Sequence, residues 1–490
     1  MAITGPTIWE VRTTGNAANG GGYDAALGGV DYSQQNAAQV AYTDLVIDAT
    51  TNTKCTSAAT PFTSNHIGNI INITGGTGFT VQRVQVVSVA AAVATCDKSL
   101  GTLSSTGGTG NLGGALINPV DADAVYAPGN VIYVESGSYA AHTSTKTFTA
   151  DGSVGVGNIS YIGYPSGGSR TDQDITEASM PVFTSATNSV AIFTTNNANF
   201  LRFRNFKITH TAGTRGVGFA NATAGTVNGP MLINCVFDGC LWAADYGTGG
   251  GATAAQHLLW QSCTIRNGTA GGLRVNGSNT CVFIDSCYIT ACAGPGISFG
   301  TTTVGLVFQA TNCVIAGQTG ASGHGLYCIC TTATTQTYHV RLIGNSIYNN
   351  AQHGIRFDLT TSRPSTLVVS NNVIVSNAAR GISCATAGII DGSQAVVRCN
   401  AFYNNSSGDR QNFATGEGDV TLSGNPFTNA GSADYSLDNT ASEGAACRSA
   451  AWSARIGALG ATAGTNYMDI GALQAQATAG GGTVAYGFAG

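Results

Sequence analysis

Two stretches of the chain decide its fold: NSIYNNAQHGIRF at residues 345–357 and NVIVSNAARGISC at residues 372–384. Each begins with an Asn followed two positions later by Ile, and each has a Gly-Ile pair toward its end. Both pairs recur along the chain. Self-similarity at a regular spacing indicates a repeat architecture, so the spacing of the copies carries the fold prediction.

The first pair is, in most copies, a small or polar residue followed two positions later by a large apolar one. Successive copies stand 29, 28, 24, 26, 32, 27 and 28 residues apart. They are Phe206-Lys-Ile208, Cys235-Val-Phe237, Cys263-Thr-Ile265, Cys287-Tyr-Ile289, Cys313-Val-Ile315, Asn345-Ser-Ile347, Asn372-Val-Ile374 and Asn400-Ala-Phe402. An apolar position three residues earlier is held by Leu232, Trp260, Ile284, Ala310, Leu342, Val369 and Val397.

The second pair is a Gly followed by an aliphatic residue, farther along most copies. Its members are Gly216-Val217, Gly272-Leu273, Gly296-Ile297, Gly325-Leu326, Gly354-Ile355 and Gly381-Ile382. Two residues later stand Phe219, Val275, Phe299, Cys328, Phe357 and Cys384. The coil around Cys235 has no clear copy of this pair.

This pattern predicts an all-β right-handed parallel β-helix with three short strands per coil. Alternate residues of a strand point to opposite faces, so the apolar positions point inward and stack on the next coil, about 4.8 Å away. A single coil cannot bury its own apolar face, which is why coils must stack. An α-solenoid is excluded because each coil contains several Gly residues and none shows a 3.6-residue period.

Amide side chains recur at two positions of the repeat: at the first residue of the first pair and five residues after it. One set is Asn345, Asn372 and Asn400, and the other is Asn350, Asn377 and Asn405. Stacked in register, each set is expected to form an amide ladder that satisfies buried polar groups between coils.

Composition narrows the function classes. Of 490 residues, 9% are charged and 43% hydrophobic, with a net charge of −5, which is typical of a folded chain and not of a disordered one. No basic stripe is present, so nucleic acid is not an expected partner. No apolar run reaches the roughly 18 residues of a membrane span. The first residues lack the pattern of a signal peptide, so we expect the protein inside the cell or released within a particle, unless a leader has been removed.

Fourteen cysteines are present, and most stand at repeat positions. We expect these to be small buried packing residues and not crosslinks. Cys55 and Cys96 lie outside the repeat, and for them the sequence leaves open a disulfide or two buried free thiols.

The pattern divides the chain into three predicted segments. Residues 1–127 form a small N-terminal β-domain for attachment, with a turn at residues 75–78. Residues 128–405 form the right-handed parallel β-helix, which is regular from about residue 201. Residues 406–490 form a loop-rich closing segment and a tail.

Several segments resemble a known group. PGNVIYVESGSY at residues 128–139 resembles the opening of pectate-lyase-like right-handed β-helix proteins, and DIGA at residues 469–472 resembles a closing element of that group. WEVRT at 9–13, GGGY at 20–23 and DYSQQ at 31–35 resemble bacteriophage virion proteins of the tailspike type. The resemblance implies the fold, but this fold carries lyases, hydrolases, tailspikes and structural rods, so it implies no catalytic residue.

Carboxylates in the regular array do not form a visible pair. Enzymatic glycan cleavage uses paired carboxylates, or calcium-binding acids with a basic residue as the base. The acids of the array, however, fall on different positions of the coil; they are Asp238, Asp245, Asp285, Asp358 and Asp391. The sequence therefore predicts no catalytic residue and no cofactor, and calcium lacks the support of any D-x-D run.

One polar constellation is a candidate for glycan binding. His324, His353 and Arg380 directly precede the Gly of the second pair on three consecutive coils, and outward positions follow each Gly. The candidate residues are His324, Tyr327, His353, Arg356, Asp358 and Arg380. Stacking would gather aromatic, basic and acidic groups on one surface. The alternative is an exposed polar column whose Arg356–Asp358 pair is a surface salt bridge of little energetic weight.

These observations favour a structural or adhesive bacteriophage virion protein: a tail, fibre or capsid-decorating rod that binds other virion proteins. Its further expected partners are cell-surface polysaccharide and its own copies, with a trimer favoured because solenoid ends expose unpaired strand edges. Two alternatives stay open. One is a polysaccharide lyase or hydrolase of the tailspike depolymerase type. The other is a self-assembling extracellular or cell-surface filament protein.

Overall fold

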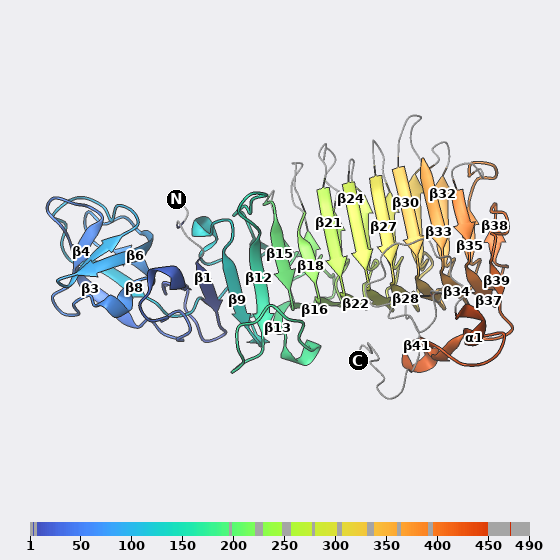
Figure 1. Ribbon diagram of the computed structural model, residues 1–490, viewed down its shortest axis with the longest axis horizontal. Helices are drawn as coiled ribbons and strands as arrows, with labels where there is room; N and C mark the ends of the chain where they lie inside the picture. The colour runs from blue at the N-terminus through green and yellow to red at the C-terminus, as the bar shows by residue number, and fades with distance from the viewer. Residues whose placement is uncertain are drawn as a thin grey trace. The chain divides into compact units, whose positions relative to one another are not determined.

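The structure is a computed structural model, and it describes residues 3, 7–195, 198–220, 229–246, 256–276, 280–300, 306–330, 338–359, 364–390, 395–448 and 471. The chain divides into two compact units, residues 1–209 with 228–236 and residues 210–227 with 237–490. The fold is an all-β right-handed parallel β-helix of about eight turns with an N-terminal antiparallel β-domain (Figure 1). The predicted fold class is confirmed.

The N-terminal β-domain, in the first unit, is a closed barrel with strand order β3-β4-β7-β6-β5-β8. Alternation along its strands sends one face inward, where Leu45, Ile73 and Val84 are fully buried. Cys55 and Cys96 are free thiols buried in this core. The elements are η1 (Ala25–Leu27), β3 (Val40–Ile47), β4 (Lys54–Thr56), η2 (Ser64–His66), β5 (Ile70–Gly75), β6 (Gln82–Ala90), β7 (Val93–Cys96) and β8 (Gly108–Leu112).

The first unit also holds the first coils. Unlike the barrel strands, β1 pairs in parallel with β9, with Ile8 opposite Val131, so the start of the chain joins a β-helix sheet. The elements are β1 (Ile8–Val11), β2 (Gly22–Tyr23), η3 (Asp123–Val125), β9 (Val131–Glu135), β10 (Gly137–Ser138), β11 (Lys146–Thr147), β12 (Ile159–Tyr164), η4 (Glu177–Ser179), β13 (Pro181–Ser185), β14 (Phe193–Thr194), β15 (Leu201–Arg204), β16 (Lys207–His210) and β18 (Met231–Ile233).

The second unit contains coils whose strands form three parallel sheets. The first sheet holds β21 (Gln256–Gln261), β24 (Thr280–Asp285), β27 (Leu306–Thr311), β30 (Tyr338–Ile343), β33 (Thr366–Ser370) and β36 (Ala395–Arg398). The second sheet holds β19 (Val236–Asp238), β22 (Thr264–Arg266), β25 (Tyr288–Thr290), β28 (Val314–Ala316), β31 (Ser346–Tyr348), β34 (Val373–Val375), β37 (Ala401–Tyr403) and β39 (Val420–Thr421). The third sheet holds β17 (Phe219–Ala220), β20 (Ala244–Tyr246), β23 (Leu273–Asn276), β26 (Ile297–Gly300), β29 (Leu326–Cys330), β32 (Ile355–Leu359), β35 (Ile382–Cys384) and β38 (Arg410–Gln411).

Most residues predicted to point inward form the core; Val397 in the last coil is only partly buried, and one copy of the second pair was out of register. Ile284, Leu342 and Val369 are at most 1% exposed. The prediction was wrong at Gly216-Val217, because Phe219 aligns with Ala244, which aligns with Leu273. The first copy of the second pair is therefore Gly218-Phe219. In the following coil Ala243-Ala244 replaces it, since alanine is also small enough for this position.

Both predicted amide ladders are confirmed. Asn345 Nδ2 donates to Asn372 Oδ1, and Asn372 Nδ2 donates to Asn400 Oδ1, each at 2.9 Å. In the second ladder Asn350 Nδ2 donates to Asn377 Oδ1 at 2.8 Å, and Asn377 continues to Asn405 in the same way. All are buried, so the amides replace water as partners between coils.

The last described segment covers the outer face of the second sheet. Phe427 and Tyr435 pack in one cluster with Val373 and Val375 of β34. The elements are β40 (Phe427–Asn429), η5 (Ala430–Ser432), β41 (Asp434–Leu437) and α1 (Gly444–Cys447). Of the predicted closing motif and tail only Gly471 is described; its backbone N–H donates to Asn371 O at 2.8 Å. No helix of the described residues is long and apolar enough to cross a membrane.

Candidate functional site

The predicted glycan-binding residues lie at the start of β29, β32 and β35 and on the outward face of the third sheet. Five of their side chains come together: His324, Tyr327, His353, Arg356 and Asp358, called here the third-sheet cluster. The side chain of the sixth predicted residue, Arg380, lies apart from these five. Its guanidinium points toward the last coil, where Nη1 donates to Arg410 O at 3.1 Å. Arg380 meets the cluster through its backbone N–H instead.

Asp358 joins two side chains of the cluster. Its carboxylate accepts from Tyr327 Oη at 2.6 Å, across adjacent coils, and from Arg356 Nε at 2.7 Å, along the same strand. The strand places Arg356 and Asp358 two residues apart, so both point outward. The predicted Arg356–Asp358 pair is therefore present, and both side chains are partly exposed.

The two imidazoles stack along the coil axis. The centroids of the two rings are 5.4 Å apart, and the ring planes are 21° from parallel. The centroid of the His324 ring also lies 4.8 Å from that of the Tyr327 ring. His324 Nδ1 accepts from the His353 backbone N–H at 3.3 Å, and His353 Nδ1 accepts from the Arg380 backbone N–H at 3.3 Å. The histidines therefore link three coils.

Burial and neighbouring cations fix the protonation of the cluster. Burial, then His353 and Arg356, lower the pKa of His324 to about 4. Burial, then Arg356 and Arg380, lower the pKa of His353 to about 4. Burial and the hydrogen bond to Asp358 raise the pKa of Tyr327 to about 12. At neutral pH both imidazoles are therefore uncharged and the phenol keeps its proton.

The outward row that contains Tyr327 and Arg356 runs over seven coils of the third sheet. Strand register aligns Asp245, Arg274, Ser298, Tyr327, Arg356, Ser383 and Gln411 on successive coils. Arg274 Nε donates to Asp245 Oδ1 at 2.8 Å, and Ser383 Oγ donates to Gln411 Oε1 at 2.8 Å. Sequence reasoning missed Asp245 and Gln411 in this row because their coils lack the Gly-aliphatic pair.

The two acids placed by strand register on the outward face of the third sheet, Asp245 and Asp358, are too far apart for a glycosidase pair. Asp245 stands four coils before Asp358, about 19 Å at 4.8 Å per coil, whereas paired catalytic carboxylates stand about 5–9.5 Å apart. Asp409 accepts from Asn405 Nδ2 at 3.1 Å, in the last coils. Asp391 lies outside the described residues. Asp238 and Asp285 lie on the second and first sheets.

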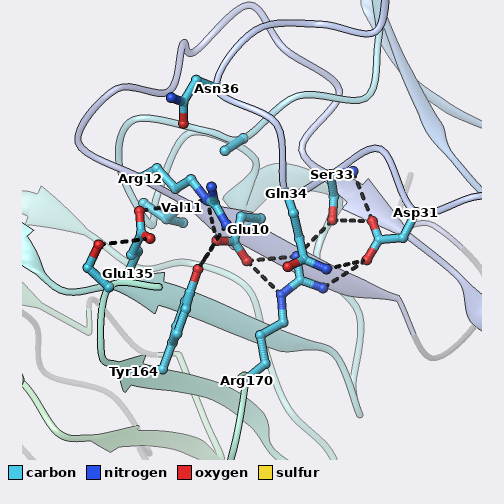
Figure 2. A network of polar contacts seen from close by, with 12 residues as sticks. Glu10, Val11, Arg12, Asp31, Ser33, Gln34, Asn36, Glu135, Tyr164 and Arg170 are labelled. Carbon is cyan, nitrogen blue, oxygen red and sulfur yellow. Dashed lines mark hydrogen bonds and ion pairs between the residues drawn. The ribbon is translucent and has the colours of Figure 1, made fainter. Parts of the chain in front are cut away.

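A second polar cluster, in the first unit, was not predicted (Figure 2). Glu10 of β1 accepts from Arg12 Nε at 2.8 Å, from Arg170 Nε at 2.7 Å, and from the Tyr164 hydroxyl. Arg170 also reaches Asp31 Oδ2, at 3.0 Å. These residues come from four separate parts of the sequence, so no local spacing could have indicated the cluster.

Burial shows what the Glu10 cluster does. The Glu10 side chain is 0% exposed, and burial raises its pKa against the opposing pull of Arg170 and Arg12. A fully enclosed carboxylate with three donors offers no room for a ligand. We interpret the cluster as structural: its ion pairs and hydrogen bonds hold the segments around residues 31 and 170 against β1.

Metal coordination finds no support in the described part of the chain. No group of three or more His, Cys, Asp or Glu side chains there could hold an ion. The 13 cysteines whose side chains are described are thiols, and most are buried within the barrel or the coils.

Comparison with known proteins gives one family match and several similar solved structures. Residues 253–429 match the family described as right handed beta helix region. Among solved structures, pectate lyase Pel9A shares 13% identity over 74% of this chain and 92% of that chain, with a TM-score of 0.46. The catalytic domain of GH87 alpha-1,3-glucanase in complex with nigerose shares 12% over 79% and 87%, with a TM-score of 0.30. No curated protein matches the chain.

Proposed function

We propose that the chain is a carbohydrate-binding β-helix that holds a polysaccharide against the third-sheet cluster. The observation that carries the proposal is the meeting of two imidazoles, a phenol and an ion pair on one face of stacked coils. Sugars are recognised by a few fixed polar groups together with apolar ring faces. The amide ladders beneath keep the coils in register, so the groups are held before a ligand arrives.

Binding is favoured over cleavage by the state of the potential catalysts. Asp358 already accepts from Tyr327 and Arg356, and Asp245, which lies in the outward row of Arg356, is four coils away. The raised pKa of Tyr327 makes it a poor base at neutral pH. The Nδ1 atoms of both imidazoles are occupied by backbone donors.

Binding of a broad panel of polysaccharides to the full chain tests the proposal. Tyr327→Ala should weaken the affinity for a bound glycan about tenfold or more, because it removes both a ring face and a hydroxyl. Arg341→Ala is the matched control: Arg341 is exposed on β30 of the first sheet, so its loss should leave affinity unchanged. Absence of binding across the panel, or an equal loss in both variants, contradicts the proposal.

A second candidate is polysaccharide cleavage by a lyase or hydrolase. Uncharged imidazoles beside Arg356 and Tyr327 favour it, since a neutral imidazole is a common base and a guanidinium stabilises negative charge. In that case purified protein should shorten a bacterial polysaccharide, and Asp358→Ala or Arg356→Ala should abolish the activity. No shortening of any polysaccharide in a broad panel would exclude this candidate.

We further propose an adhesive role within a bacteriophage virion, with the barrel of the first unit as the attachment part and the chain as a homotrimer. We assign attachment to the barrel because it has a closed sheet and a buried core of its own. Sedimentation velocity should give the mass of three chains, and electron microscopy of native particles should show density for the β-helix. A monomer, or particles without that density, would contradict the role.

A further inference from the structure

The ring of His353 lies between two hydrogen-bond donors. Its Nδ1 is 3.3 Å from the backbone N of Arg380, and its Nε2 is 3.4 Å from Arg356 Nη1. A neutral imidazole carries one N–H and one acceptor nitrogen, and a guanidinium is always protonated. His353 can therefore accept from only one of these two donors.

The ladder decides which contact is the hydrogen bond. His324 repeats the geometry one coil earlier, where its Nδ1 accepts from the His353 backbone N–H. Arg356 Nη1 has another acceptor, Ser383 Oγ at 3.1 Å, and so does not depend on His353. Since the backbone N–H of Arg380 points at Nδ1, the stable tautomer has Nδ1 as the acceptor and the proton on Nε2.

This tautomer turns Nε2–H of His353 toward Nη1 of Arg356. Two donors 3.4 Å apart cannot bond each other. Within the described part of the chain, no acceptor is recorded for the Nε2–H. The pair lacks only an oxygen that could accept from both.

We propose that His353 Nε2 and Arg356 Nη1 form an oxygen-binding subsite, in which one oxygen of a bound sugar accepts a hydrogen bond from each. The ligand class is a glycan oxygen acceptor, either a hydroxyl or a carboxylate oxygen. This inference rests on the proposed carbohydrate binding and adds where and through which atoms a sugar is held. Asp358 keeps the guanidinium in place through Arg356 Nε.

Nitrogen-15 NMR of the full chain labelled at histidine tests the tautomer without a ligand. At pH 7 both His324 and His353 should show a protonated Nε2 and an unprotonated Nδ1; the variants His324→Gln and His353→Gln assign the signals. An Nδ1–H tautomer at His353 would overturn the subsite, whether or not any glycan binds.

Binding of glycans then tests the subsite itself. His353→Leu removes the acceptor and the donor and should weaken affinity about tenfold. His353→Gln, whose amide can accept from Arg380 N–H and still donate, should retain most of it. A glutamine already accepts a backbone N–H on a neighbouring ladder, where Gln318 Oε1 takes Cys292 N–H at 2.9 Å. Thermal unfolding checks that each variant folds, and Arg356→Lys, which keeps a cation at a partly exposed position, replaces His353→Leu if that variant does not fold.

The binding experiment is done with two classes of ligand, neutral glucans and uronate-bearing polysaccharides. If His353→Leu loses affinity for neutral glucans, the bound oxygen is a hydroxyl. If it loses affinity only for uronate-bearing polysaccharides, the bound oxygen belongs to a carboxylate. Either result supports the subsite. Unchanged affinity in His353→Leu, or in Arg356→Lys where it is used, overturns the subsite but leaves the proposed function standing. Absence of all binding overturns both.

Discussion

At the scale of the residue, a buried histidine sets a pH dependence in the first unit. His142 is 3% exposed, with its ring between those of Phe183 and Phe193. Burial, followed by the charge of Lys146, lowers its pKa to about 4. In the unfolded chain the pKa is near 6.5, so the unfolded state takes up the proton first as the pH falls. Stability is therefore complete above about pH 7 and is lost as the pH falls toward 4.

Replacing this ring by a hydrocarbon should remove that pH dependence. Between pH 8 and pH 5, the free energy of unfolding of the wild type should fall by about 2 kcal/mol more than that of His142→Phe. Urea unfolding at the two pH values measures the difference. The exposed His257 provides a control, since His257→Gln should leave the dependence as in the wild type. Equal slopes in His142→Phe and the wild type would show that His142 does not carry the effect.

At the scale of the element, the amide ladder makes one side chain serve three coils. Asn372 Oδ1 accepts from Asn345, and Asn372 Nδ2 donates to Asn400 Oδ1 and to Leu342 O. Asn372→Ala leaves these buried partners without their bonds, so we expect a loss of about 2–4 kcal/mol in the free energy of unfolding. Urea unfolding measures it. Asn349→Gly is the control: Asn349 is exposed with φ of 51°, so glycine should cost little or nothing. A loss in Asn372→Ala as small as that in the control would argue against the ladder.

The coils and their inward positions could be predicted because each side chain of the repeat has a counterpart on the next coil. The turns could not. The residue directly before the first pair adopts a positive φ in many coils. Its type differs from coil to coil, as Ser286, Asn312 and Cys399 show. Residues of several types can adopt the positive φ of this turn, so the turn produces no recurring residue type that the sequence could reveal. Gly216-Val217 was misplaced for a related reason, since another Gly follows two residues later.

At the scale of the whole molecule, contacts between distant parts of the sequence escaped prediction. Arg170 and Glu10 are 160 residues apart and belong to no repeat, so only the folded chain brings them together (Figure 2). The third-sheet cluster could be predicted in part because its members share the repeat. Arg380 was assigned a side-chain role there, but its guanidinium bonds to Arg410 O instead.

Assembly depends on how the last coil ends. Arg410 aligns with the inward Ile382, and its guanidinium lies 4.2 Å from the centroid of the Phe402 ring. It pairs at 2.5 Å with Asp419, whose side chain is 2% exposed and whose Oδ1 accepts Asn400 N–H as the end of the first ladder. A charged pair therefore lies against the apolar core in the last coil of the described residues, where an uncharged coil would otherwise stack. This argues against end-to-end filaments through this face.

Removing the pair tests that argument. Arg410→Leu should lower the free energy of unfolding by about 2–4 kcal/mol, because Asp419 is left buried without its cation. The double variant Arg410→Leu with Asp419→Asn should recover much of the loss, since neither charge remains. In sedimentation velocity it should also form species larger than the wild type as the concentration rises, because its last coil now presents apolar surface and uncharged ladder amides. A double variant that keeps the wild-type sedimentation at every concentration would mean that something other than this pair prevents stacking.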